Sequence, residues 1–112
     1  MRRRIGEFAY SENRRDLGYV EEREETTLED GSKYKGCWLR GMETRQGQGV
    51  MTWPDGSVYE GYWKDNKPDG KGRMVSSKGD IYDGQWLNGM ASGQGKFTHR
   101  DGTVYEGFWK ED

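Results

Sequence analysis

Aromatic residues and glycines alternate with polar residues in four short segments of this 112-residue chain. Each segment has the form Tyr-x-Gly-x-Trp, and the four begin 25, 23 and 23 residues apart, at Tyr34, Tyr59, Tyr82 and Tyr105. Gly-x-Gly pairs recur between them, each followed by a further glycine: Gly47/Gly49 with Gly56, Gly70/Gly72 with Gly79, and Gly93/Gly95 with Gly102. Self-similarity at a fixed spacing predicts a repeat protein in which each repeat is one supersecondary unit.

Each repeat has the features of a β-hairpin. Residues 57–63 are rich in aromatic and β-branched side chains, which favours a strand. Residues 64–69 are expected to turn, and Gly70 to about Val75 to run back. Asp55-Gly56 is typical of a hairpin turn, because glycine adopts the positive φ that tight turns require. The sequence therefore predicts an all-β fold, an elongated single-layer antiparallel meander of about seven strands.

The two-residue period of a strand assigns the side chains to two faces. Tyr59, Gly61 and Trp63 share one face, and we expect Gly70, Gly72 and Met74 of the returning strand to join them. A strand glycine leaves room for an aromatic ring of the neighbouring strand to lie over bare backbone. The opposite, solvated face is expected to pair opposite charges from Glu60, Asp83, Glu106, Lys71, Arg73 and Lys96.

Composition narrows the function classes. Eighteen glycines, five tryptophans and seven tyrosines favour order based on aromatic residues, and a formal net charge of −2 gives no general attraction to nucleic acid or anionic membranes. The near-neutral repeat region lacks the cationic groove that base-stacking platforms need. A single cysteine excludes an internal disulfide and favours a reducing compartment. No apolar run suggests a secretion signal or a membrane span.

Residues 1–27 lack the glycine and tryptophan period, and we expect an irregular, charged N-terminal extension that is flexible or docks a partner. The stretch 21–25 could be a helical turn or a solvated tether. We expect five apolar side chains to dock onto a neighbouring surface, so that deletion of residues 1–25 would weaken partner binding and preserve the repeat fold: Ile5, Phe8, Tyr10, Leu17 and Tyr19.

No catalytic or metal-binding constellation is evident. His99 lies at a turn without a base or triad around it, and Cys37 has no second ligand for zinc. The Gly-x-Gly pairs lie within strands and lack the remainder of a phosphate-binding loop. Residues 65–70 match a calcium loop poorly and favour a turn. Carboxylates on an open sheet face have no pocket to raise a pKa. The sequence predicts no enzyme, cofactor or metal.

These motifs resemble the MORN (membrane occupation and recognition nexus) repeat family over residues 28–112, about three and a half repeats. The resemblance implies hairpins stacked into an elongated sheet with an aromatic-lined groove, in scaffolds of cilia, flagella and other cytoskeletal assemblies. The chain departs from the pattern at Cys37, where Tyr62 and Phe108 stand in other copies, and at Asn66, which replaces a glycine. The last repeat lacks its returning strand, so we expect an open edge that favours strand addition by another chain or a parent protein that continues.

We therefore predict a non-catalytic scaffold that binds a segment of a partner protein in the groove, in the cytoplasm and within the cytoskeleton, in a ciliary or flagellar axoneme. Two alternatives are a peripheral phospholipid-binding tether and the targeting segment of a longer enzyme such as a lipid kinase. The predicted partner-binding residues are Tyr34, Trp38, Met51, Tyr59, Trp63, Met74, Tyr82, Trp86, Phe97, Tyr105 and Trp109.

Overall fold

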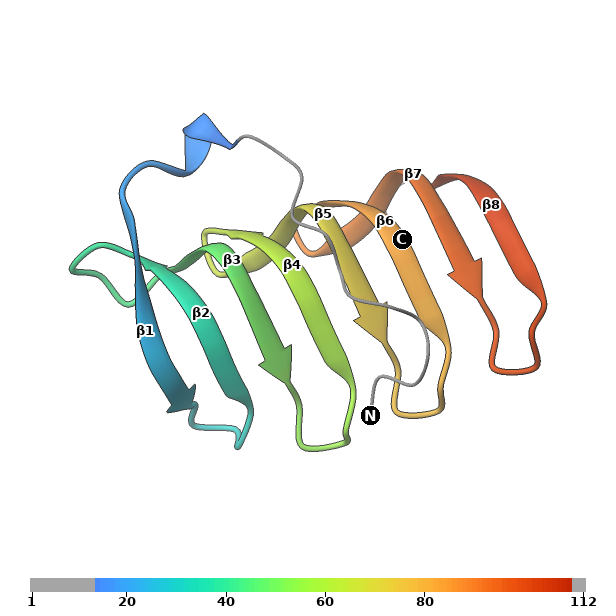
Figure 1. The fold of residues 1–112 in the computed structure, drawn as a ribbon, viewed down its shortest axis with the longest axis horizontal. Coiled ribbons are helices and arrows are strands. Elements are labelled where there is room, and N and C mark those ends of the chain that lie inside the picture. The colour runs from blue at the N-terminus through green and yellow to red at the C-terminus, as the bar shows by residue number, and fades with distance from the viewer. Residues whose placement is uncertain (1–13, 110–112) are drawn as a thin grey trace.

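The computed structural model describes residues 14–109, which form one antiparallel sheet whose eight strands lie in chain order (Figure 1). A short 3-10 helix, η1, precedes the sheet. No helix within residues 14–109 is long and apolar enough to span a membrane. The predicted all-β, single-layer meander is confirmed, with elements η1 Arg15–Leu17, β1 Val20–Thr27, β2 Lys33–Leu39, β3 Arg45–Thr52, β4 Val58–Lys64, β5 Lys67–Val75, β6 Ile81–Leu87, β7 Met90–Thr98 and β8 Val104–Trp109.

Strand β1 corrects the expectation for the N-terminal extension. Residues 21–25 form neither a helical turn nor a tether, because they lie within β1 and pair with β2 from Val20 opposite Leu39 to Thr27 opposite Lys33. Pairing satisfies the backbone groups that β2 would otherwise present at an open edge. The meander thus has eight strands instead of about seven. Deletion of residues 1–25 would remove most of β1, so that truncation does not leave the sheet intact.

The Asp-Gly turns form as predicted at one end of the hairpins. In the second turn, the Trp53 N–H donates to the Ser57 carbonyl at 2.9 Å, and the Gly56 N–H donates to the Trp53 carbonyl at 2.9 Å. Gly56 has a φ of 94°, and the Asp55 carboxylate accepts a bond from the Ser57 N–H. The same two backbone bonds recur in all four turns at this end, at residues 28–32, 53–57, 76–80 and 99–103, the third of which has Lys78-Gly79 in place of Asp-Gly.

Tighter turns close the other end of the hairpins. Asp65 and Asn66 have φ angles of 52° and 69°, and Asn88 and Gly89 have 53° and 86°. Asparagine tolerates this left-handed conformation better than most residues, so Asn66 can replace a glycine there. The predicted turn after β4 is confirmed, although β5 begins at Lys67, earlier than expected.

The strand register aligns the repeats into rows that cross the sheet. Tyr59 lies opposite Met51 on β3 and Met74 on β5, in a row of tyrosines alternating with large apolar residues. From β2 to β8 the neighbouring row consists of glycines, and Arg23 of β1 lies opposite the first of them: Gly36, Gly49, Gly61, Gly72, Gly84, Gly95 and Gly107. Beyond this row a bulge shifts the register at the second, fourth and sixth strands. The rows place every repeat's tyrosine and tryptophan on one face, as predicted.

Candidate interaction surfaces

An aromatic ladder runs across one face of the sheet. Each repeat's tyrosine meets the tryptophan four residues later, and the first three tyrosines also meet the tryptophan of the next repeat. Thus Tyr59 contacts Trp63 at a centroid distance of 5.2 Å and Trp86 at 5.3 Å, with interplanar angles of 90° and 83°. Such edge-to-face pairs contribute about 0.5–1.5 kcal/mol each beyond their buried area. The rings follow one another in the order Trp38, Tyr34, Trp63, Tyr59, Trp86, Tyr82, Trp109 and Tyr105.

Glycines beneath the tyrosine rings make this ladder possible. The ring of Tyr59 lies over Gly72 on the neighbouring strand, where a Cβ would come within 2.0 Å of the phenol oxygen. The ring of Tyr82 lies in the same way over Gly95, with a corresponding distance of 2.1 Å. The predicted role of these glycines as receptacles for neighbouring rings is confirmed.

Hydrogen bonds fix the rings in the middle of the ladder. The Tyr59 hydroxyl donates to the carbonyl of Tyr62 at 3.0 Å. The indole N–H of Trp63 donates to the Gly49 carbonyl at 3.1 Å, and Trp86 makes the equivalent bond at 3.2 Å. At both ends of the ladder the indole bond is missing, because the buried Nε1 atoms of Trp38 and Trp109 have no acceptor within residues 14–109. The β2 end keeps its tyrosine bond, in which the Tyr34 hydroxyl donates to the Cys37 carbonyl at 2.7 Å.

Exposure along the ladder divides the predicted partner-binding residues into two groups. Six of them are buried, at 5% exposure or less: Tyr34, Trp38, Met51, Tyr59, Trp63 and Tyr82. Four are partly buried, namely Met74, Trp86, Phe97 and Trp109, and the last, Tyr105, is 53% exposed. The part of the aromatic face that a partner could reach thus lies over β5–β8.

A shallow apolar hollow lies beside Met74. It has a volume of about 460 Å³ and is lined by Trp53, Pro54, Asp55, Ser57 and Met74. Trp53 also packs against the buried part of the ladder. The repeat comparison missed Trp53, because Ser76 and His99 occupy its position in later repeats. The signal in the sequence that could have indicated Trp53 is a large apolar side chain at a turn next to the aromatic face.

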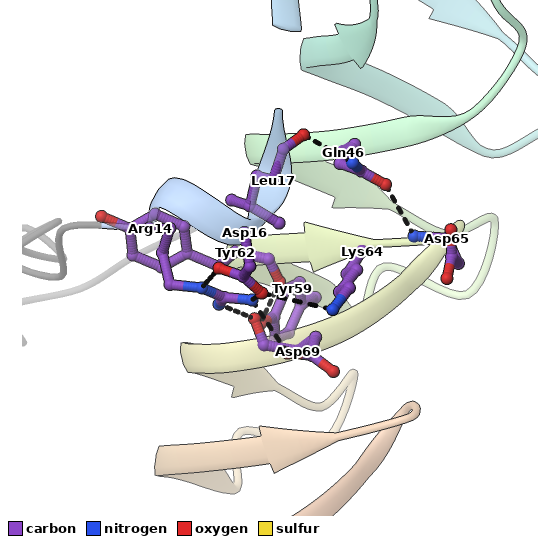
Figure 2. A network of polar contacts seen from close by, with 9 residues as sticks. All are labelled: Arg14, Asp16, Leu17, Gln46, Tyr59, Tyr62, Lys64, Asp65 and Asp69. Carbon is purple, nitrogen blue, oxygen red and sulfur yellow. Dashed lines mark hydrogen bonds and ion pairs between the residues drawn. The ribbon is translucent and has the colours of Figure 1, made fainter. Parts of the chain in front are cut away.

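Residues 14–17, here called the strap, fold onto the opposite face of the sheet (Figure 2). The Leu17 side chain is buried at 4% exposure, and its carbonyl accepts a bond of 2.6 Å from Nε2 of Gln46. Oε1 of Gln46 accepts a bond from the Asp65 N–H, which ties the strap to the β4–β5 turn. Leu17 therefore docks as expected, but on its own chain. Tyr19 is 83% exposed and does not dock, while residues 5, 8 and 10 lie outside the described residues.

Arg14 anchors the strap through several contacts. Its guanidinium lies 5.6 Å from the Tyr62 ring centroid and donates to the Asp69 carbonyl at 2.9 Å and carboxylate at 3.0 Å. It also donates to Asp16, whose carboxylate accepts a bond of 3.2 Å from Lys64. The bond to Asp16 raises the pKa of Arg14, and the same bond holds the pKa of Asp16 well below its usual range. The strap is thus fixed by charges that persist at neutral pH.

The face that carries the strap also bears a row of charges. The Arg73 side chain donates to Asp83 on the next strand at 2.6 Å, which confirms the predicted cross-strand pairing there. Lys96 and Glu106 continue the row at the β8 end. The expectation of a merely solvated face is wrong at the strap, where Tyr62 is only 3% exposed. Tyr62 was missed as a docking residue, since Cys37, Gln85 and Phe108 replace it in the other repeats.

The residues considered for catalysis do not converge. His99 is exposed at its turn, packs on Phe97 at 4.7 Å, and has its Nδ1 3.9 Å from the carboxylate of Asp80. Burial raises the pKa of the Cys37 thiol, which disfavours the reactive thiolate. Across residues 14–109 no three His, Cys, Asp or Glu side chains are placed to share a metal ion.

A series of hairpins with one aromatic ladder and one row of glycines defines a β-hairpin repeat protein. The sequence matches the family model of the MORN repeat in three consecutive copies, at residues 34–58, 59–81 and 82–104. The chain therefore belongs to the MORN repeat family, as its motifs predict. It is also similar to alsin from Rattus norvegicus, with 44% identity over 46 residues, which cover 41% of this chain and 3% of alsin.

Membership of this family assigns a general class of function. MORN repeats are interaction modules for proteins or membranes, and the repeat itself is non-catalytic. The match to alsin spans a very small part of that protein's length.

Proposed function

We propose that this protein is a non-catalytic scaffold that binds a segment of a partner protein on the aromatic face over β5–β8. The main support for this proposal is that the exposed fraction of the ladder tyrosines rises sharply toward β8. Tyr59 is 0% exposed and Tyr105 is 53% exposed, although both make the same contact with their own tryptophan, at 5.2 and 5.3 Å. Exposed aromatic side chains of this kind are favoured anchors in protein interfaces.

The spacing of the ladder indicates the form of the bound segment. Equivalent rings of successive repeats lie two strands apart, which is about 9.5 Å. A polyproline II segment crossing the strands has three residues per turn and advances about 9.3 Å in that turn, and a helix advances about 10.5 Å in seven residues. Either could place apolar side chains against Trp86 and Trp109 in turn, with another in the hollow beside Met74. The proposed ligand therefore has apolar residues at one of these two spacings.

Two phenylalanines on opposite faces offer a matched test. Phe97 lies on the aromatic face of β7, and Phe108 lies on the charged face of β8 and is 71% exposed. Partners are captured from a cell extract with the intact chain, with Phe97→Ser and with Phe108→Ser, each shown by circular dichroism to be folded. We expect Phe97→Ser to lose the captured protein and Phe108→Ser to retain it. Equal retention, or loss with Phe108→Ser alone, would contradict binding on the aromatic face.

Membrane binding is the competing outcome, and it is measured separately. The intact chain is mixed with phosphatidylserine vesicles and separated by flotation at low and high salt. We expect little flotation, because basic and acidic residues are interleaved in the repeats. Strong, salt-sensitive flotation would favour a peripheral lipid tether.

We further propose that the assembly is cytoskeletal, in a cilium or flagellum. The support for this proposal is the resemblance to the MORN repeat family, which implies scaffolds of cilia, flagella and other cytoskeletal assemblies. A fluorescently tagged chain expressed in a ciliated cell line tests it, and diffuse fluorescence without enrichment at the axoneme would contradict it.

A further inference from the structure

Among residues 14–109, one edge of strand β8 has no partner strand. It pairs with β7 from Thr98 opposite Val104 to Gly93 opposite Trp109, and no residue in 14–109 pairs with its other edge. Four of its six residues are exposed, and three of these are large apolar residues with more than half of their surface accessible: Val104, Tyr105 and Phe108. Unpaired strand edges bind extended segments through backbone hydrogen bonds, and the side chains along the edge determine which sequences fit.

The pairing of β4 and β6 shows which residues lie opposite a strand that carries the Tyr-x-Gly-x-Trp sequence. Opposite β4, strand β5 places Met74 against Tyr59, Arg73 against Glu60 and Gly72 against Gly61. Opposite β6, strand β7 repeats the set with Phe97, Lys96 and Gly95 against Tyr82, Asp83 and Gly84. These two pairs of strands share one pattern, in which a Gly-x-Gly-basic-apolar sequence lies antiparallel to a Tyr-acidic-Gly sequence. Strand β3 keeps the glycine and the apolar residue opposite β2, where Gly49 faces Gly36 and Met51 faces Tyr34, but Val50 faces Lys35 in place of the charge pair.

Tyr105 lacks the contacts that this pattern supplies to its equivalents. Tyr59 and Tyr82 each meet two tryptophans, and each ring lies over a glycine of the following strand. Tyr105 meets Trp109 alone among the described residues, and the nearest glycine beneath it is Gly107 of its own strand. The hydroxyl of Tyr59 donates to a carbonyl three residues later, a bond that Tyr105 does not make within residues 14–109.

We propose that the free edge of β8 binds an extended segment of another protein with the sequence Gly-x-Gly, then Lys or Arg, then Met or Phe. The segment runs antiparallel to β8, with its second glycine opposite Gly107, its basic residue opposite Glu106 and its apolar residue opposite Tyr105. This edge site shares Tyr105 with the aromatic face over β5–β8 proposed above, but it binds through the backbone of β8 and is tested separately from that face.

Each position of the segment has its own physical reason. The second glycine is required because the Tyr105 ring will lie over it, and at the equivalent Gly72 and Gly95 a Cβ would come within 2.0–2.1 Å of a tyrosine oxygen. The first glycine corresponds to Gly70 and Gly93, whose φ angles of 95° and 83° suit a glycine best. The basic residue complements the exposed Glu106 carboxylate.

Synthetic peptides test the site without altering the protein. The probe has the sequence of residues 67–75, Lys-Pro-Asp-Gly-Lys-Gly-Arg-Met-Val, and is titrated into the ¹⁵N-labelled full chain. We expect the largest amide shifts along β8 and at the Trp109 indole. A peptide with Gly72→Ala should bind at least tenfold more weakly, whereas one with Lys71→Ala should bind within about twofold of the probe.

Charge reversal tests the register. A peptide with Arg73→Glu should bind the intact chain several-fold more weakly and recover on a Glu106→Lys protein. Absence of β8 shifts at millimolar peptide, equal binding of the Gly72→Ala peptide, or shifts confined to β5–β7 would overturn the proposal. So would β8 shifts that depend on protein concentration without peptide, because a second copy of this chain would then occupy the edge. A Met74→Ser protein alters the aromatic face on β5, three strands away from β8, and should bind the probe normally, which separates this result from failure of the face proposal.

Discussion

The two ends of the aromatic ladder share one repeat pattern but differ in how completely they are covered. Tyr34 and Trp63 near β2–β4 are at most 1% exposed, whereas Tyr105 on β8 is 53% exposed. The rings nevertheless meet in the same way, since the Tyr34 to Trp38 distance is 5.2 Å and the Tyr105 to Trp109 distance is 5.3 Å. The repeat sequence thus determines how the rings meet, and other residues determine what can reach them.

Two arginines account for much of the cover at the β2–β4 end. The Arg45 guanidinium lies 5.2 Å from the Trp63 ring centroid and 5.8 Å from that of Tyr34. Arg23 on β1 lies 5.0 Å from the ring of Trp38. In the later hairpins the position of Arg45 opposite the tryptophan is taken by Pro68 and Ala91, which carry no charge. Arginine side chains therefore cover the ladder rings near β2–β4. Uncharged residues at the equivalent positions of the later hairpins leave the rings there more accessible to solvent.

Replacing one tryptophan in each part should give the largest difference between them. Trp63→Ala removes a ring that is 1% exposed, two edge-to-face contacts and the bond to the Gly49 carbonyl. We expect it to lower the free energy of unfolding by about 4 kcal/mol. The matched Trp109→Ala should cost about 1–2 kcal/mol, because its ring is partly exposed and its N–H is unbonded. Urea unfolding measures both, and equal losses would mean that the two parts are equally well packed.

Replacing the covering arginine should produce an intermediate effect. Burial lowers the pKa of Arg45, which indicates a desolvated cation, and a desolvated cation over an aromatic ring contributes about 2 kcal/mol. We therefore expect Arg45→Ala to lower the free energy of unfolding by about 2 kcal/mol and to increase acrylamide quenching of tryptophan fluorescence. Arg45→Met keeps the apolar stem, so it should restore the protection from quenching but only part of the stability. If Arg45→Ala leaves quenching unchanged, the cover has another source.

The repeats themselves could be predicted from the sequence, and the difference between them could not. The turns, the glycine row and the tyrosine and tryptophan face follow from residues that recur every repeat. Arg45 and Trp53 occur once each, so comparison of the repeats could not reveal them. Strand β1 was missed for a related reason, because its sequence Val-Glu-Glu-Arg-Glu-Glu-Thr-Thr lacks apolar alternation and becomes a strand by pairing with β2. The strap likewise depends on Tyr62 and Arg14, which no other repeat duplicates.

The strap should give the smallest effect, and it tests whether cover on the charged face also supports the ladder. The pKa of Asp16 is lowered in the folded protein by its bond from Arg14, so its contribution to stability is complete above the ordinary carboxylate pKa of about 4. That contribution is lost as the pH falls from about 4 toward the depressed pKa. Because the group is half exposed, we expect Asp16→Asn to cost less than about 1 kcal/mol at neutral pH.

Two readouts separate the strap from the ladder in this last comparison. The stability difference between the intact chain and Asp16→Asn should be constant above about pH 5 and shrink below about pH 4. The side-chain amide of Gln46, which bonds to the Leu17 carbonyl, should report loosening of the strap by NMR. Tryptophan quenching should stay unchanged, since Arg45 and not the strap lies over Trp63. A parallel rise in quenching would show instead that the two faces of the β2–β4 region are coupled, and that the exposure of the β8 end reflects the lack of such support there.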